Sequence, residues 1–208
     1  MDRKDFYGIL EKLHTKEVTH RLAKGAVGIA GLGGLGSNVA VMLARAGIGR
    51  LVIADFDRVE TGNLNRQFYF TEQIGLEKTE ALKDILGRVN PFVEITAFNT
   101  KITDSNIKRI FGRCDIIVEA FDKPEYKVMV VESVLEKFPE KYVVAASGLA
   151  GYGKCNEMKV EKIGHLYLCG DQVSEVKPGV PLMSPRVTIA AAMEANCVVE
   201  IFMEELSG

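Results

Sequence analysis

The stretch AVGIAGLGGLG at residues 26–36 decides the fold class. Residues 26–30 are all apolar or glycine, as in a short strand buried on both faces, and residues 31–36 match the pattern G-x-G-x-x-G. Apolar residues from Ser37 to Ala46 have helical spacing, and Gly47 then favours the end of the helix. A strand, a glycine-rich turn and a helix in this order predict the first unit of a nucleotide-binding α/β sheet.

Strands and helices alternate along the chain on the carboxyl side of this unit. Apolar runs predict strands at 50–54, 93–98, 115–119 and 142–146, with helices expected at 77–88, 104–112 and 124–138. Such alternation predicts a Rossmann-like α/β fold, a mainly parallel sheet with helices on both faces. Ahead of the sheet, residues 2–22 are expected to form one amphipathic helix.

The pattern changes after residue 150. Residues 151–183 contain many glycines and prolines, with short strands expected at 158–160 and 165–168, whereas 185–205 is typical of a buried helix. We therefore expect an irregular, antiparallel C-terminal extension and a terminal helix. The prediction is one domain with four parts: an N-terminal helix (1–24), a nucleotide-binding core (25–150), a crossover-type segment (151–183) and a C-terminal helix (184–208).

Composition and charge exclude several functional classes. The chain has 208 residues, 47% of them hydrophobic, and its 26 basic and 28 acidic residues leave a net charge of -2. This balance argues against a nucleic-acid partner, which normally requires a basic patch. No apolar run approaches the roughly 20 residues that span a membrane, and the charged first residues do not resemble a signal peptide. We expect a cytoplasmic protein with no membrane partner.

The cysteines are scattered and form no CxxC pair, so the sequence predicts neither a zinc site nor a disulfide framework. The histidines likewise form no cluster that would favour a metal site. The cysteines are Cys114, Cys155, Cys169 and Cys197.

The glycine-rich turn predicts a phosphate site. Glycines permit a tight turn and let the backbone approach a phosphate, while N–H groups and the dipole at the helix start attract the anion. In such sheets an acidic residue at the end of the next strand, about 20 residues on, binds ribose hydroxyls. Asp55 has that place. Through the turn, the residues expected to contact a nucleotide are Gly31, Gly33, Gly34, Leu35 and Gly36.

The segment after Asp55 indicates which chemistry follows. The glycine pattern alone is typical of nicotinamide dehydrogenases, but these do not need phosphate-directed side chains just beyond the ribose acid. Lys78 begins the next expected helix, and Asp122 follows the expected strand at 115–119, so both belong at the carboxyl edge of the sheet. The polar side chains that favour an enzyme acting on phosphates are Asn63, Arg66, Gln67 and Lys78.

Taken together, these residues resemble the ThiF/MoeB superfamily, the bacterial relatives of ubiquitin-activating enzymes. The resemblance runs from about residue 20 to 205. Within the superfamily, the short length of the chain and its C-terminal segment at 185–200 are most similar to short ThiF proteins. The resemblance is carried by GLGGLG at 31–36, DFD at 55–57, NLNRQF at 63–68, the element at 75–78, and Phe121-Asp122-Lys123, which stands where the family has T-D-N.

The resemblance implies adenylation. The C-terminal Gly-Gly carboxylate of a ubiquitin-like sulfur carrier, similar to ThiS, would attack the α-phosphate of ATP and release pyrophosphate, for thiamine thiazole biosynthesis. ATP and Mg²⁺ are the implied cofactors. A C-terminal carboxylate has a pKa of about 3.5 and is already ionised at neutral pH, so the reaction needs no general base. Catalysis then depends on positioning and on neutralising charge.

The resemblance also implies a role for each polar residue. Arg66 and Lys78 are the expected catalytic residues on the phosphate oxygens, and Asp122 is the expected catalytic ligand of Mg²⁺. Asp122 also has a simpler interpretation, as a cap of the helix that follows it. The other expected contacts to the nucleotide come from Asp55, Asp57, Asn63 and Gln67, of which Asp57 would either join the magnesium shell or cap its turn.

Several family features depart from this sequence or stay open in it. The family often has two CxxC pairs that bind zinc, and their absence again predicts no zinc. A homodimer is implied, and many members supply an arginine to the partner subunit from near the N-terminus. Arg3 and Arg21 are the candidates, although Arg21 is also typical of a solvated helix end. Cys169 is a candidate for sulfur transfer, but we favour an inert, partly buried thiol.

Three alternative functions remain. In the first, the enzyme adenylates another acceptor, either a molybdopterin-type carrier or a modified tRNA base as in the related threonylcarbamoyl-adenosine dehydratases; the lack of a basic tract disfavours the tRNA base. In the second, the chain is instead a nicotinamide dehydrogenase. In the third, it is a nucleotide-binding homologue that has lost catalysis, as the missing zinc ligands and the altered context of Asp122 would indicate.

Overall fold

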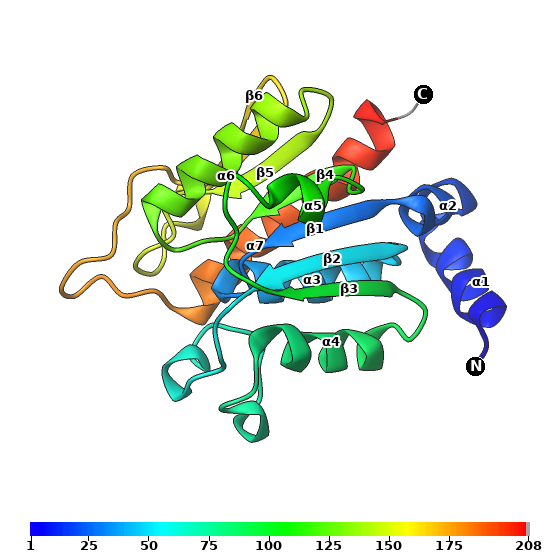
Figure 1. The fold of residues 1–208 in the computed structure, drawn as a ribbon, viewed down its shortest axis with the longest axis horizontal. Helices are drawn as coiled ribbons and strands as arrows, with labels where there is room; N and C mark the ends of the chain where they lie inside the picture. Colours follow the sequence, from blue (N-terminus) through cyan, green and yellow to red (C-terminus); the bar gives the residue numbers. More distant parts are fainter. Residues whose placement is uncertain (207–208) are drawn as a thin grey trace.

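A seven-stranded sheet forms the centre of the computed structural model, which describes residues 1–206 (Figure 1). The strand order is β3-β2-β1-β4-β5-β7-β6, and every neighbouring pair is parallel except β6 with β7. The predicted Rossmann-like sheet with an antiparallel extension is confirmed. The strands are β1 (Ala26–Ala30), β2 (Arg50–Asp55), β3 (Glu94–Asn99), β4 (Ile116–Glu119), β5 (Tyr142–Ala146), β6 (Lys159–Ile163) and β7 (Leu166–Gly170).

Helices connect these strands and cover both faces of the sheet. Among residues 1–206, no helix combines the length and the apolar character that crossing a membrane requires. The helices are α1 (Arg3–His14), α2 (Lys16–Lys24), α3 (Gly34–Ala46), α4 (Lys78–Val89), α5 (Ile107–Phe111), α6 (Pro124–Lys137) and α7 (Ser184–Glu200), which continues into a π-helical turn at Ile201–Glu205.

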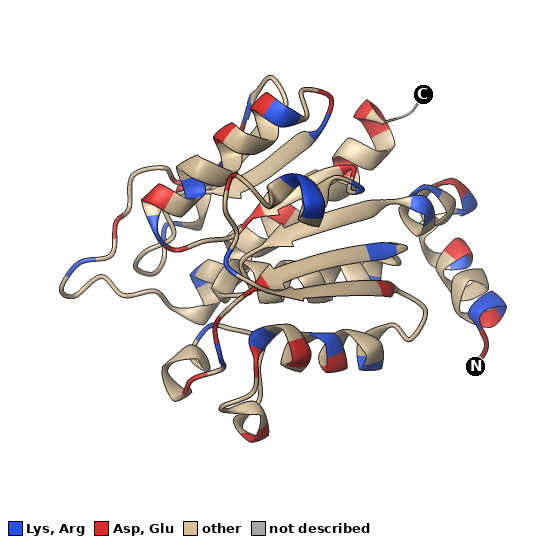
Figure 2. Ribbon diagram, in the orientation of Figure 1, with Lys and Arg blue, Asp and Glu red and all other residues tan. Residues whose placement is uncertain are grey.

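The two layers of helices form because side chains alternate along each strand. On one face, α3, α4 and α7 pack on strand residues such as Val27 and Ile53. On the other face, α5 and α6 pack on residues such as Val52 and Ile117. β1, β4 and β5 are buried along their whole length, as their apolar runs predict. Figure 2 marks positively and negatively charged residues interspersed along the helices and loops, whereas β1 and β5 have none.

The position of the site follows from the strand order. β1 pairs with β2 on one side and with β4 on the other. After β1 the chain turns into α3 on one face of the sheet, and after β4 it turns into α6 on the opposite face. The carboxyl ends of β1 and β4 therefore border a crevice, the place where open α/β sheets bind their ligands.

The prediction of a single N-terminal helix over residues 2–22 is wrong. Two helices, α1 and α2, meet at Thr15, whose φ of 78° ends the first helix. The side-chain oxygen of Thr15 accepts a hydrogen bond from the N–H of Val18 at 3.5 Å, so the same residue caps the start of α2. His20 and Glu11 lie 2.8 Å apart and join the two helices. Both helices lie at the amino ends of the strands, away from the crevice (Figure 1).

Residues 151–183 are more regular than their composition indicates, because β6 and β7 extend the sheet there. Cys169, expected in an irregular segment, is fully buried within β7, and its Sγ lies 3.8 Å from Cys197 Sγ on α7. The interaction with Cys197, together with burial, raises the pKa of the Cys169 thiol. A buried, protonated thiol is poorly suited to sulfur transfer.

Two arginines hold the C-terminal part of the chain. Arg21 on α2 donates hydrogen bonds to the carbonyls of Phe202 (3.5 Å) and Met203 (2.9 Å), so its guanidinium binds the end of its own chain. Arg186 on α7 is buried and forms an ion pair with Asp171, which fixes the loop after β7. Of the two candidates for an arginine donated across a dimer, Arg3 is the one whose guanidinium is not engaged in this way.

Glu194 is an unusual residue of the core. It is fully buried on α7, and neither carboxyl oxygen has a hydrogen-bond partner among residues 1–206. Burial raises the pKa of Glu194 well above its ordinary value. The folded protein therefore holds a proton on this carboxyl more tightly than the unfolded chain, in which its pKa is about 4.3. Because folding must then retain a proton, this residue lowers stability as the pH rises above that value.

Replacing Glu194 with leucine should therefore stabilise the protein. We expect Glu194→Leu to raise the free energy of unfolding at pH 7 by about 1–3 kcal/mol, the cost of a buried unsatisfied polar group. The gain should be smaller at pH 5, close to the pKa of the unfolded chain. Urea unfolding at both pH values measures this, with Glu194→Gln as the uncharged polar control. A variant less stable than the parent at pH 7 would contradict the assignment.

Candidate active site

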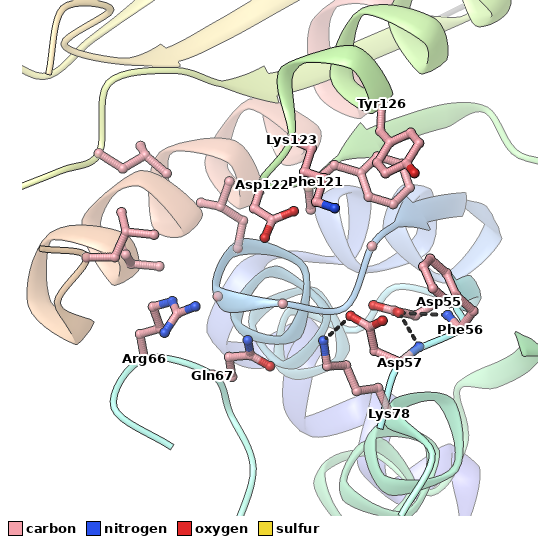
Figure 3. A pocket seen from close by; sticks show the side chains of 18 residues that line it. Asp55, Phe56, Asp57, Arg66, Gln67, Lys78, Phe121, Asp122, Lys123 and Tyr126 are labelled. Atoms are coloured by element: carbon pink, nitrogen blue, oxygen red, sulfur yellow. Dashed lines mark hydrogen bonds and ion pairs between the residues drawn. The ribbon is translucent and has the colours of Figure 1, made fainter. Parts of the chain in front are cut away.

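A pocket of about 280 Å³ opens at the carboxyl edge of the sheet (Figure 3). Its walls come from the glycine-rich turn, the end of β2, the segment at 66–78, the residues after β4, and three apolar residues of the C-terminal third. The lining residues are Gly31, Gly33, Gly34, Leu35, Asp55, Phe56, Asp57, Arg66, Gln67, Lys78, Ala120, Phe121, Asp122, Lys123, Tyr126, Leu149, Leu182 and Val187.

The glycine-rich turn is packed so tightly that residue 36 has no room for any side chain. A Cβ atom at Gly36 would lie 1.9 Å from the carbonyl oxygen of Gly31, which itself has a φ of 93°. Helix α3 begins at Gly34, three residues before the predicted start at Ser37. No side chain caps this end of α3, so its first N–H groups remain available to a ligand.

The segment at 63–68 is bound directly to this turn. The Ser37 hydroxyl on α3 accepts a hydrogen bond from the N–H of Phe68 (2.9 Å), and the Asn38 side chain donates to the carbonyl of Arg66 (3.1 Å). A Cβ atom at Gly34 would lie 3.4 Å from the Arg66 side chain, so the stem of Arg66 passes over the turn. Two motifs that are separate in the sequence therefore form one wall of the pocket.

Asp55 connects the end of β2 to the turn. One carboxylate oxygen accepts the N–H of Leu32 (2.7 Å), and the other accepts those of Phe56 (2.7 Å) and Asp57 (2.9 Å). The Tyr69 hydroxyl donates to the Leu32 carbonyl at 2.8 Å. Burial, followed by the charges of Asp55 and Asp57, raises the pKa of Tyr69, which keeps this hydroxyl a donor.

Lys78 and Asp57 form an ion pair at the floor of the pocket. Lys78 is only 5% exposed, and its Nζ lies 2.9 Å from Asp57 Oδ2 (Figure 3). The backbone N–H of Lys78 also donates to the carbonyl of Asp57 at 3.0 Å. Asp57 thus fixes the ammonium group at the start of α4, an arrangement that neither of its two predicted roles included.

Arg66 and Gln67 have free hydrogen-bonding capacity toward the pocket. The Arg66 guanidinium donates to the Asn65 side chain (2.7 Å) and the Gly62 carbonyl (3.3 Å), and no carboxylate of residues 1–206 forms an ion pair with it. Gln67 Oε1 is buried and has no hydrogen-bond partner within that range. An unpaired cation in the crevice indicates an anionic group on the ligand, and the unsatisfied amide oxygen of Gln67 indicates a hydrogen-bond donor on it.

Asp122 follows β4 and reaches the pocket from the side opposite Lys78 in Figure 3. It is exposed and forms no ion pair within residues 1–206. The same range holds no group of three or more His, Cys, Asp or Glu residues placed to bind a metal. Mg²⁺ needs no such group, because it commonly binds through one or two carboxylates together with substrate phosphates and water. The donor set fits that mode of binding.

This arrangement is matched by known proteins. The ThiF family model covers residues 9–205 of the chain. The chain belongs to the ThiF family. Ubiquitin-like modifier-activating enzyme 5 of Caenorhabditis elegans is 38% identical over 132 residues, which are 58% of this chain and 32% of that protein. Adenylyltransferase and sulfurtransferase UBA4 of Kluyveromyces lactis is 33% identical over 150 residues, 72% of this chain and 33% of that protein. The chain spans about a third of the length of these relatives.

Solved structures agree with the ThiF fold. The tRNA N6-threonylcarbamoyladenosine dehydratase TcdA of E. coli, in complex with ATP, superposes with a TM-score of 0.88 at 19% identity and covers 98% of this chain and 96% of that one. MccB of E. coli with ATP gives a TM-score of 0.69 at 25% identity, covering 91% of this chain and 58% of that one. At 19% identity, the likeness to TcdA shows the fold alone.

In this ThiF-family chain, two predicted contacts do not line the pocket. Asn63 instead accepts the N–H of Glu60 through its side chain at 3.0 Å, and Gly36 lies behind the turn. Sequence reasoning also missed several lining residues. Tyr126 lies in the first turn of α6, directly after the Phe121-Asp122-Lys123 element. The apolar residues Leu149, Leu182 and Val187 had no signal in the sequence.

Proposed function

We propose that the chain uses ATP to adenylate a carboxylate, and that its acceptor is the C-terminus of a ubiquitin-like carrier protein. The observation that carries this proposal is the convergence of four polar groups on one pocket at the uncapped start of α3. Arg66, Gln67 and Lys78 supply donors to phosphate oxygens, and Asp122 supplies a ligand for the metal. A dehydrogenase requires none of these groups.

The pocket suggests how ATP would lie in it. Asp55 has about four lone-pair positions, of which backbone N–H groups occupy three, so one is left for a ribose hydroxyl. The phosphates would then extend along the turn and the start of α3 toward Arg66, which lies at the other end of the pocket in Figure 3. Lys78 lies between these ends, held by Asp57.

The reaction needs little from the protein beyond positioning. An oxygen of the ionised carboxylate forms a bond to the α-phosphorus of ATP, the bond from that phosphorus to pyrophosphate breaks, and the pyrophosphate keeps the electron pair. Arg66 and Lys78 neutralise the charge that develops on the phosphates. Bound through Asp122 and the phosphates, Mg²⁺ would supply further neutralisation of that charge.

The acceptor that we favour is a ThiS-like sulfur carrier, for thiamine thiazole synthesis, as the resemblance to short ThiF proteins implies. A molybdopterin-type carrier is the nearest alternative. The name of UBA4 includes both adenylyltransferase and sulfurtransferase, which is in line with a sulfur-carrying acceptor. The name of TcdA instead points to a modified tRNA base, but the net charge of -2 and the interspersed charges of Figure 2 disfavour a tRNA acceptor.

Pyrophosphate exchange tests this proposal. With ATP and Mg²⁺, we expect label from pyrophosphate to enter ATP only when a ThiS-like carrier ending in Gly-Gly is present, and not with a carrier lacking those two residues. Calorimetry should show binding of ATP and no appreciable binding of NAD. Tight NAD binding without ATP binding would favour a dehydrogenase. ATP binding without exchange for any carrier would favour a non-catalytic homologue.

We also propose a homodimer, as the resemblance implies. Helix α1 exposes the apolar side chains of Ile9 and Leu13, which supports packing against a partner. Sedimentation at micromolar concentration should give twice the mass of the chain. A fully active monomer would refute this.

A further inference from the structure

A buried ion pair holds the backbone directly before Asp122. The Glu119 carboxylate, at the end of β4, accepts the N–H of Phe121 at 2.7 Å through Oε1. On α6, the ammonium of Lys127 donates to the carbonyl of the same Phe121 at 3.0 Å, and lies 2.7 Å from Glu119 Oε2. Both polar groups of residue 121 are therefore fixed by one ion pair.

Stability alone gives little reason for this pair. The Glu119 side chain is completely buried and that of Lys127 is 23% exposed, so both charges lose hydration. Burial raises the pKa of the Glu119 carboxyl, and the positive charge of Lys127 acts in the opposite direction. Apolar residues of similar volume often replace a buried ion pair without loss of stability. What they cannot provide is a donor and an acceptor for the Phe121 peptide groups.

The consequence of the pair lies in the site. Phe121 and Asp122 belong to the short connection between β4 and α6, residues 120–123, and both line the pocket. Because this connection is short and both peptide groups of Phe121 are held, the backbone from which the Asp122 side chain starts is constrained. We infer that Glu119 and Lys127 are positioning residues, which hold the backbone at 121 so that Asp122 meets the metal and the phosphates. This inference rests on the proposed function of Asp122.

Lys127→Met is the main variant, and Lys137→Met is its matched control. Lys137 lies on the same helix, and its ammonium forms an ion pair with Asp104 at the far end of α6 from the pocket. Both substitutions remove one ammonium from one ion pair. Lys127→Arg keeps a cation and tests rescue, and it also serves if Lys127→Met does not fold.

Three readouts separate positioning from a merely structural role. They are hydrogen exchange of the peptide covering residues 120–123, the Mg²⁺ concentration that half-saturates ATP binding by calorimetry, and kcat with KM for ATP in pyrophosphate exchange. For Lys127→Met we expect faster hydrogen exchange, at least about a tenfold higher Mg²⁺ requirement, and a similar fall in kcat. ATP binding without Mg²⁺ should not change. Lys127→Arg should restore most of the loss, and Lys137→Met should change none of these.

The outcomes distinguish this inference from the proposed function. If Asp122→Asn raises the Mg²⁺ requirement while Lys127→Met leaves it as in the parent, positioning by the pair is refuted and the role of Asp122 stands. Equal effects of the two lysine variants would refute positioning as well. If Asp122→Asn has no effect on Mg²⁺-dependent ATP binding or on exchange, the proposed role of Asp122 itself fails.

Discussion

Arg66→Ala is expected to lower the rate of adenylation by about a hundredfold or more while weakening ATP binding far less. The guanidinium has no ion-pair partner within residues 1–206 and lies at the end of the pocket away from Asp55. The charge that it would neutralise grows as pyrophosphate departs. Its contribution is therefore larger in the transition state than in the ground state, which lowers kcat when it is lost.

Arg66→Lys should rescue this loss poorly. A lysine ammonium is a point charge and does not reproduce the planar fork that binds two oxygens. The aliphatic part of the Arg66 side chain also packs over Gly34, so the shorter lysine side chain would not place its ammonium where the guanidinium lies. Single-turnover rates with a saturating carrier measure both variants.

Asp55→Ala is the comparison. It removes contacts to the ribose that are the same before and during the reaction, so it should mainly raise the Kd for ATP. It also leaves the N–H of Leu32 without its acceptor, so we expect lower stability and would measure binding well below the melting temperature. An Arg66→Ala enzyme with the normal rate, together with an Asp55→Ala enzyme that loses rate but not affinity, would reverse our two assignments.

Gly36→Ala should disrupt the nucleotide site although residue 36 does not line the pocket. The added methyl group would overlap the carbonyl oxygen of Gly31, a backbone atom that cannot rotate away as a side chain can. Either α3 or the turn must move. Overpacking of this kind costs about 1–3 kcal/mol of stability or more, and the moved turn would bind phosphates poorly. We expect at least about a tenfold loss in ATP affinity, by analogy with other displaced binding groups.

Gly87→Ala is the matched control on α4. A Cβ atom there meets nothing within 4 Å, so the same added methyl group has room. Alanine is also the better helix former, and we expect this variant to gain about 0.5–1 kcal/mol with unchanged ATP binding. Thermal unfolding and ATP calorimetry on both variants test the pair. Equal stability and affinity in Gly36→Ala and the parent would show that the turn is more adaptable than its packing indicates.

Local patterns in the sequence were sufficient to predict which strands and helices follow one another between residues 26 and 146, and the place of the crevice at the carboxyl edge of the sheet. Apolar runs and glycine spacing are properties of neighbouring residues, and they decide local structure before any distant contact forms. For the same reason the glycine-rich turn, Asp55 and the segment at 63–68 could be assigned to one nucleotide site. The apolar spacing does not indicate the break at Thr15, because helical spacing continues on both sides of that residue.

Only the tertiary structure decided which side chains meet. The sheet order sets α6 against the end of β4, and thereby brings Lys127 to Glu119; the folding of residues 56–78 brings Asp57 to Lys78. The tertiary structure also places the Arg21 guanidinium against the carbonyl of Met203, in the π-helical turn that follows α7. Such pairs depend on strand order and on the path of irregular loops, which join residues far apart in sequence. No local periodicity encodes them, because their free energy arises only when the distant segments have been brought together.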